Sequence, residues 1–113
     1  MRLGWIITLC VCANAQITWA ESWTPMNNAE ITAALSEKTY IYADATQMFY
    51  ASGRTLYNAG RESWGYWAAR GDQYCSQWPP GELWSCYDLE RGAPGVIRFV
   101  APDGSATEGR LAK

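Results

Sequence analysis

The fold is decided by the stretch Tyr74-Cys75-Ser76-Gln77-Trp78-Pro79-Pro80-Gly81-Glu82-Leu83-Trp84-Ser85-Cys86-Tyr87. Its two ends are mirror images of each other, and a Pro-Pro-Gly-Glu loop separates them. Such a palindrome predicts two antiparallel strands joined by a four-residue turn. In that register Cys75 lies opposite Cys86, and Tyr74 lies opposite Tyr87.

The N-terminus predicts a signal peptide spanning residues 1–20. Arg2 is followed by an apolar run from Trp5 through Ala13 and then by small residues, so cleavage after Ala20 fits best. Cleavage after Ala15 is the alternative. The apolar run is much shorter than the roughly 20 residues that a membrane-spanning helix needs. We therefore expect no stable membrane insertion after cleavage.

Two of the four cysteines, Cys10 and Cys12, lie within this segment. The residues before them are bulky, whereas lipoprotein processing requires a small residue, so we expect both to leave with the signal peptide. Cys75 and Cys86 are then the only cysteines left, which predicts one cross-strand disulfide. A disulfide in a small domain indicates an oxidising compartment, so we expect a periplasmic or secreted protein.

Residues 21–113 form a single secreted β domain in this interpretation. They keep 11 acidic residues and lose one of the nine basic ones, Arg2, so the net charge becomes −3. That balance disfavours nucleic acid as a partner, because nucleic-acid binding requires clustered Lys and Arg.

Hydrophobic periodicity predicts one helix followed by strands. Asn27-Asn28 can cap a short helix with Glu30 in its first turn. About seven short strands follow, at residues 38–43, 47–51, 54–58, 64–70, 73–78, 84–90 and 96–100. The tail either adds a short edge strand or frays. We expect a mainly β protein, a small antiparallel meander that forms a curled sheet or a small barrel.

A two-residue turn at Gly71-Asp72 extends the hairpin register and sorts three strands into two faces. The more continuously apolar face should be the core; it carries Gly65, Trp67, Ala69, Tyr74, Ser76, Trp78, Leu83, Ser85, Tyr87 and Leu89. The other face carries the candidate ligand-binding residues Trp64, Tyr66, Gln77, Trp84 and Asp88. Flat aromatic rings beside amide and carboxylate groups suit stacking against a sugar or an apolar ligand. Alternatively, the helix or barrel closure covers these aromatics, and a ligand cavity lies inside the barrel instead.

Catalysis finds little support in the sequence. There is no His, the two remaining cysteines are expected to be oxidised, and no nucleophile elbow or phosphate loop is present. The carboxylates Asp72, Asp88 and Glu90 could act as a pair, but a turn residue and solvated strand ends explain them better. We therefore expect no enzyme, no catalytic residues, no cofactor and no metal site.

The run Gly65-Tyr66-Trp67, then Gly71 to Cys75, Trp78, Cys86, Ile97-Arg98-Phe99 and Gly104, resembles a pattern in small secreted bacterial β domains of unknown function. That pattern is Gly-x-Trp, Cys-x-x-Trp, Cys, Phe and Gly on consecutive strands. The resemblance implies a small antiparallel β domain in the periplasm or outside the cell. It brings no established activity and no site residues.

These observations predict a secreted, non-enzymatic binding module whose aromatic side chains hold a small or saccharide ligand. The alternative is a protein-interaction or inhibitor domain that acts through the loop from Pro79 to Trp84. A hydrolase comes third. The sequence identifies neither the ligand nor the partner.

Overall fold

The computed structural model describes Gly4 and residues 22–113, so the predicted signal peptide lies outside the described residues apart from Gly4. The described part is mainly β with one short helix, as predicted. Its elements are β1 (Thr24–Pro25), α1 (Asn28–Leu35), β2 (Lys38–Ile41), β3 (Thr46–Phe49), β4 (Arg54–Asn58), β5 (Glu62–Arg70), β6 (Gln73–Gln77), β7 (Trp84–Arg91), β8 (Val96–Val100) and β9 (Ala106–Leu111).

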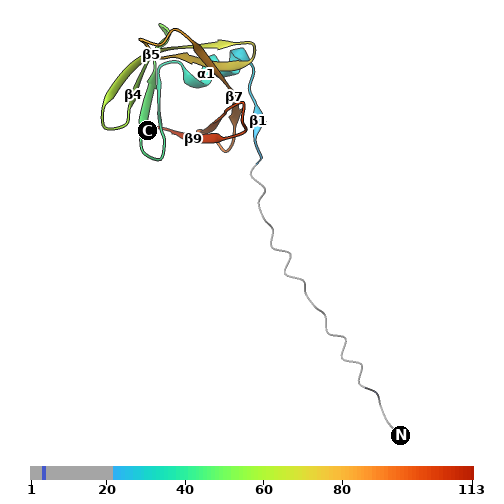
Figure 1. The fold of residues 1–113 in the computed structure, drawn as a ribbon. Coiled ribbons are helices and arrows are strands. Elements are labelled where there is room, and N and C mark those ends of the chain that lie inside the picture. The colour runs from blue at the N-terminus through green and yellow to red at the C-terminus, as the bar shows by residue number, and fades with distance from the viewer. Residues whose placement is uncertain (1–3, 5–21) are drawn as a thin grey trace.

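The sheet closes into an antiparallel barrel (Figure 1). Each strand from β2 to β8 pairs with the next one along the chain, and β9 returns to pair with β2. Eight strands therefore form the barrel, and the two-residue β1 adds to the far end of β7 through Thr24 and Pro25. The predicted count of about seven strands is too low. The tail, expected to add a short edge strand or to fray, instead forms β9, which pairs with β8 on one side and β2 on the other. Neither the polar β9 nor the two-residue β1 carries the apolar alternation that indicates a strand.

The predicted hairpin register is confirmed. Tyr74 pairs with Tyr87 and Cys75 with Cys86, and the two cysteines form a disulfide with an S–S distance of 2.06 Å. The Gly71-Asp72 turn is also as predicted, with φ of 58° at Gly71 and 59° at Asp72. Positive φ at both central residues is the geometry that a two-residue hairpin of this twist requires.

Helix α1 packs against the barrel at one end and lies within the ring of strands in Figure 1. Asn27 and Glu30 form a capping box, as the sequence indicates, and Ile31 and Leu35 are completely buried. The helix start is held to the β5–β6 turn, because the backbone N–H groups of Asn28 and Asp72 each donate to the other's side-chain oxygen, at 2.9 and 2.8 Å. Among the residues that the structure describes, no helix is long and apolar enough to cross a membrane.

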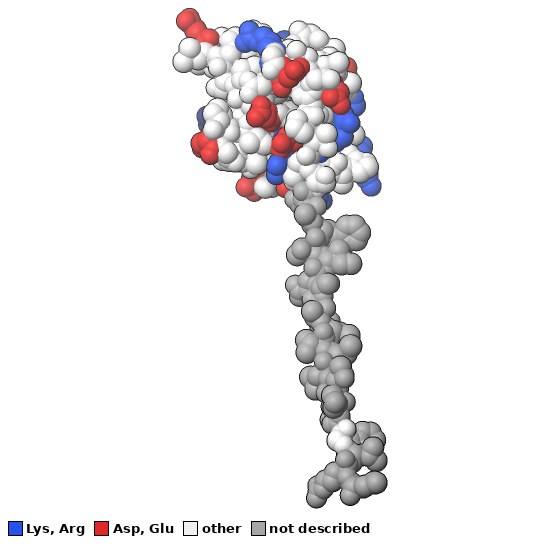
Figure 2. Space-filling model, turned by 90° about the vertical axis from the view of Figure 1, so that its right-hand side faces the viewer, with Lys and Arg blue, Asp and Glu red and all other residues white. Residues whose placement is uncertain are grey.

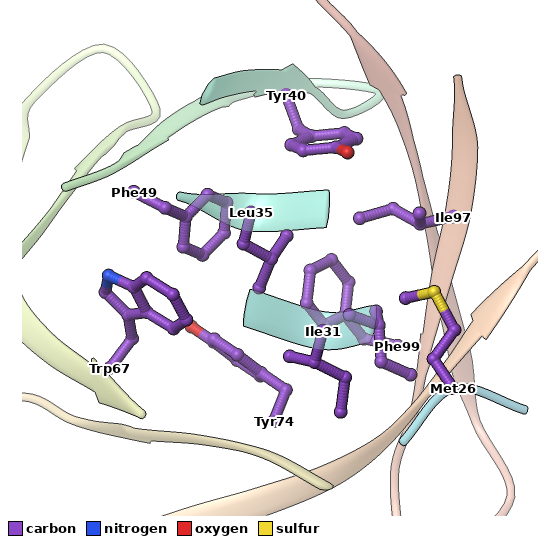
Figure 3. Packing of buried hydrophobic residues seen from close by; sticks show 10 residues of the cluster. Met26, Ile31, Leu35, Tyr40, Phe49, Trp67, Tyr74, Ile97 and Phe99 are labelled. Carbon is purple, nitrogen blue, oxygen red and sulfur yellow. The ribbon is translucent and has the colours of Figure 1, made fainter. Parts of the chain in front are cut away.

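The core fills the half of the barrel next to α1 (Figure 3). Phe49 makes ring edge contacts to Tyr40, Trp67 and Tyr74 at centroid distances of 5.8–6.2 Å. The other members of this cluster are Met26, Ile31, Leu35, Leu89, Ile97 and Phe99. The indole N–H of Trp67 donates to the carbonyl oxygen of Tyr50 at 2.9 Å, so this core polar group is satisfied.

Successive turns of a meander alternate between the two ends of its barrel. The turns at residues 36–37, 50–53, 71–72 and 92–95 therefore lie at the end that α1 occupies, which we name the closed end. The turns at residues 42–45, 59–61, 78–83 and 101–105 lie at the opposite end, the open end.

Candidate functional site

The five residues predicted to bind a ligand lie on the outer wall of the barrel. Trp64 and Tyr66 belong to β5, Gln77 to β6, and Trp84 and Asp88 to β7. The side chains of Trp64, Tyr66 and Trp84 are 43%, 46% and 37% exposed. The sequence left open that helix α1 covers these aromatics. Their exposure shows that it does not.

Three of the five side chains are direct neighbours across the strands. Tyr66 pairs with Gln77, and Gln77 pairs with Trp84, while Trp64 lies two residues from Tyr66 on the same face. Asp88 is separated from this group by Cys86 and instead accepts a hydrogen bond from the amide of Gln73 at 3.0 Å. The structure thus brings four of the predicted residues together and leaves Asp88 apart.

Guanidinium groups lie over two of the exposed rings. The Cζ atom of Arg54 is 4.3 Å from the centroid of the Trp64 ring, and that of Arg70 is 4.5 Å from the centroid of Trp84. Tyr50 also stacks on Trp64 at 5.9 Å. These contacts occupy ring faces that a sugar would need for stacking. Ligand binding on the outer wall stays a prediction.

The interior of the barrel offers a second and more enclosed candidate site. A cavity of about 780 Å³ opens at the end opposite α1. Its size lies within the usual range for small-molecule sites, about 300–1,000 Å³. The lining comprises Tyr42, Ala43, Asp44, Ala45, Gln47, Tyr57, Ser63, Trp64, Tyr74, Ser76, Trp78, Pro79, Tyr87, Phe99 and Thr107. Trp64, one of the five predicted residues, therefore borders this cavity as well as the outer wall.

Gln47 organises the polar floor of this cavity. Its amide oxygen accepts a hydrogen bond from the Tyr42 hydroxyl at 2.8 Å. Its amide nitrogen donates to Thr55 Oγ1 at 2.9 Å and to the Tyr74 hydroxyl at 3.3 Å. Among the described residues, no buried side-chain nitrogen or oxygen lacks a partner. A fully bonded amide at this depth holds the surrounding phenols in fixed positions.

The phenols around Gln47 stay neutral over the physiological pH range. Burial raises the pKa of Tyr74 to about 12, with hydrogen bonds from Ser76 and Gln47 partly opposing the shift. Burial also raises the pKa of Tyr42, and the neighbouring phenols of Tyr74, Tyr57 and Tyr40 raise it further. The cavity floor is therefore polar but uncharged.

Two glycines on the inner wall make room for the largest rings of the cavity. A Cβ atom at Gly65 would lie 2.6 Å from Cε3 of Trp78, and one at Gly109 would lie 2.8 Å from Cε1 of Tyr42. Any side chain at these positions would push the rings inward. The Gly-x-Trp pattern at Gly65 thus has a structural reason, since the bare backbone is the surface on which Trp78 rests.

The face predicted to be core is wrong at Leu83 and Ser85, which are exposed because the strand pairing ends at Gln77 and Trp84. The rest of this face divides between two roles. Trp67 and Leu89 belong to the core beside α1, whereas Ser76, Trp78 and Tyr87 line the cavity. Sequence reasoning did not assign Tyr42, Gln47, Tyr57, Phe99 and Thr107 to a site. Their only signal is that each occupies an inward position on its strand, and this has meaning only once β2 to β4 and β8 to β9 are known to complete a barrel.

The lining of the cavity consists of aromatic rings, hydroxyl groups and one amide, with Asp44 at the open end. Across Gly4 and residues 22–113, no group of three or more His, Cys, Asp or Glu side chains is placed to hold a metal ion.

No family model matches the chain, and no curated protein or solved structure matches it. The resemblance to small secreted bacterial β domains therefore stays an expectation from the sequence.

Proposed function

We propose that this protein is a non-enzymatic binding module that holds a small ligand in the aromatic-lined cavity of its barrel. The observation that carries this proposal is the cavity of about 780 Å³, open at one end and lined by Tyr, Trp and Phe rings around a polar floor. Pockets of this size and composition typically bury most of the surface of a small molecule. The disulfide between Cys75 and Cys86 supports the further proposal that the protein acts in the periplasm or outside the cell.

A neutral solvatochromic dye tests the proposal without knowledge of the natural ligand. Nile red fluoresces strongly in apolar sites, so its emission should rise with the purified protein, and emission of Trp78 should be quenched. Thr107 lines the cavity, whereas the next residue, Glu108, points to the outer wall by strand alternation. Thr107→Phe should weaken dye binding by partly filling the cavity, and Glu108→Phe, which adds the same ring outside, should not. Equal effects of the two variants would refute a cavity site.

A protein-interaction function through the loop from Pro79 to Trp84 is the second candidate. Leu83 is 87% exposed where this loop leads into β7, next to the partly exposed Trp84. An apolar side chain this exposed on a projecting loop is a plausible anchor for a partner. A partner bound by the wild type and by Thr107→Phe, but lost with Leu83→Ser, would favour this function over the cavity.

A further inference from the structure

The charge of the cavity lining restricts what can enter it. Asp44 is the one charged residue in the lining, and the part of the chain that the structure describes contributes no Lys or Arg to it. A carboxylate or phosphate group would therefore lose its hydration without gaining a counter-charge, which is strongly unfavourable. Neutral and cationic ligands do not meet this penalty and are compatible with the lining.

The Gln47 amide and the Trp78 indole offer little to a polyhydroxylated neutral ligand, and the groups left for one are the hydroxyls of Tyr57, Ser63, Tyr87 and Thr107 and the Asp44 carboxylate. Recognition of a sugar requires several free donors and acceptors, and those of the Gln47 amide are already bonded to Tyr42, Thr55 and Tyr74. The indole N–H of Trp78 likewise donates to Ser76 Oγ at 3.2 Å. These internal bonds would have to be exchanged before a sugar could use them.

The aromatic rings, by contrast, present faces in several orientations. Tyr57 lies between two neighbours: its ring centroid is 6.1 Å from that of Trp78, at 74°, and 6.3 Å from that of Tyr42, at 32°. Phe99 meets Tyr42 edge-on at 5.9 Å and 75°. Rings set at steep angles around one space can direct their negative faces toward a single cation, which is how proteins bind quaternary ammonium groups.

The rim of the open end adds a negative field. We define this rim as the four open-end turns and the strand residues that flank them. Within residues 22–113 it carries one basic residue, Arg61, and four acidic ones, Asp44, Glu62, Glu82 and Asp103, a net charge of −3. A cavity mouth of one charge sign raises the local concentration of ligands of the opposite sign.

The closed end has the opposite balance. Its turns and flanking strand residues carry two acidic residues, Glu37 and Asp72, and four basic ones, Lys38, Arg54, Arg70 and Arg91. Acidic and basic side chains are interspersed on the face of the molecule in Figure 2.

From these observations we propose that the cavity binds an organic cation, a substituted ammonium group attached to an apolar or aromatic body. The rings of Tyr42, Tyr57, Trp78 and Phe99 contact the cation, and Asp44 with the acidic rim attracts it. This inference rests on the proposed function, because it names the ligand class of the same cavity.

Three para-substituted phenols of similar size test the inference. They are (para-hydroxyphenyl)trimethylammonium, its neutral isostere para-tert-butylphenol, and the anion para-hydroxybenzenesulfonate. Binding is measured by calorimetry and by quenching of Trp fluorescence, in low salt and at a mildly acidic pH at which all three phenols are protonated. We expect the cation to bind about tenfold more tightly than the isostere, the ratio that cation–π attraction at a desolvated site gives. The anion should bind most weakly.

A charge variant and its matched control complete the test. Asp44→Asn should weaken binding of the cation about threefold at low salt and leave para-tert-butylphenol unaffected, since only the cation responds to the lost charge. Glu37→Gln removes the same charge at the closed end and keeps an oxygen that can accept from the Ala51 N–H, so it should change neither affinity.

The possible outcomes separate the inference from the proposed function. Equal or tighter binding of para-tert-butylphenol, or preference for the anion, would overturn the cation and leave a ligand cavity standing. Failure of all three phenols in a protein that still binds Nile red would also overturn it. If the dye does not bind either, the proposed function fails as well.

Discussion

Replacing Gly65 with Ala tests the geometry on which the cavity depends. The new Cβ atom would lie 2.6 Å from Cε3 of Trp78 and 2.7 Å from the carbonyl oxygen of Gln77. Ordinary carbon contacts are about 3.5–4.0 Å, so the indole would have to move by roughly 1 Å. The carbonyl oxygen has less freedom, because Gln77 pairs with Tyr66 in the β5–β6 ladder. Overpacking of this kind typically costs 1–3 kcal/mol, and we expect about 2 kcal/mol here.

Thermal unfolding followed by circular dichroism measures this cost. In a domain of this size, about 2 kcal/mol lowers Tm by about 8–16 °C. The double variant Gly65→Ala/Trp78→Leu should be less destabilised than the sum of the two single variants, by about 1 kcal/mol, because the ring contact is counted only once. Strict additivity, or a loss below about 0.5 kcal/mol for Gly65→Ala, would show that Trp78 does not rest on Gly65.

Three further outcomes follow from the structure. Mass spectrometry of oxidised protein should find Cys75 and Cys86 joined, and reduction should cost about 3 kcal/mol by the chain-entropy model, so two free thiols would contradict the structure. Trp84→Ala should cost only about 1 kcal/mol, because this side chain is 37% exposed, whereas Trp67→Ala, at 6% exposed, should cost about 3–5 kcal/mol; equal losses would be inconsistent with an outer-wall Trp84. Stability should fall as the pH rises from 10 toward 12, because Tyr74 keeps its proton in the folded state and loses it in the unfolded chain; an ultraviolet titration that shows every Tyr ionising near pH 10 before unfolding would contradict this.

The local features of the fold were predictable because each depends on neighbouring residues. The capping box at Asn27 and Glu30, the Gly71-Asp72 turn and the opposed Cys75 and Cys86 all follow from short-range patterns. Closure of the barrel was not predictable in the same way. It depends on pairing between β2 and β9, which lie at opposite ends of the domain sequence, and β9 has no apolar alternation that would reveal it.

The candidate site likewise combines features that could be predicted from the sequence with features that depend on barrel closure. Strand alternation correctly separated Tyr66 and Trp84 from Ser76 and Trp78, and the more apolar face was expected to be the core, but alternation could not say that part of this face would line a cavity. Only closure decides this, because it turns this face into an interior that the core beside α1 fills in part and the cavity occupies in part. Gln47 shows the difference most clearly: in sequence it is an ordinary polar strand residue, and in the barrel it is a buried amide bonded to three side chains.

The pairing of β2 with β9 also governs the order in which this chain can fold. Its ladder has only two residue pairs, Tyr40 with Leu111 and Ile41 with Arg110, whereas the neighbouring ladders have four or five. This short ladder joins the first and last strands of the barrel, so the ring cannot be completed until the residues of β9 have been synthesised. Loop-closure entropy makes such a long-range contact a late event in folding. The cavity, which exists only inside a closed ring, is consequently among the last parts of the molecule to form and the first to be lost when the pairing of β2 with β9 opens.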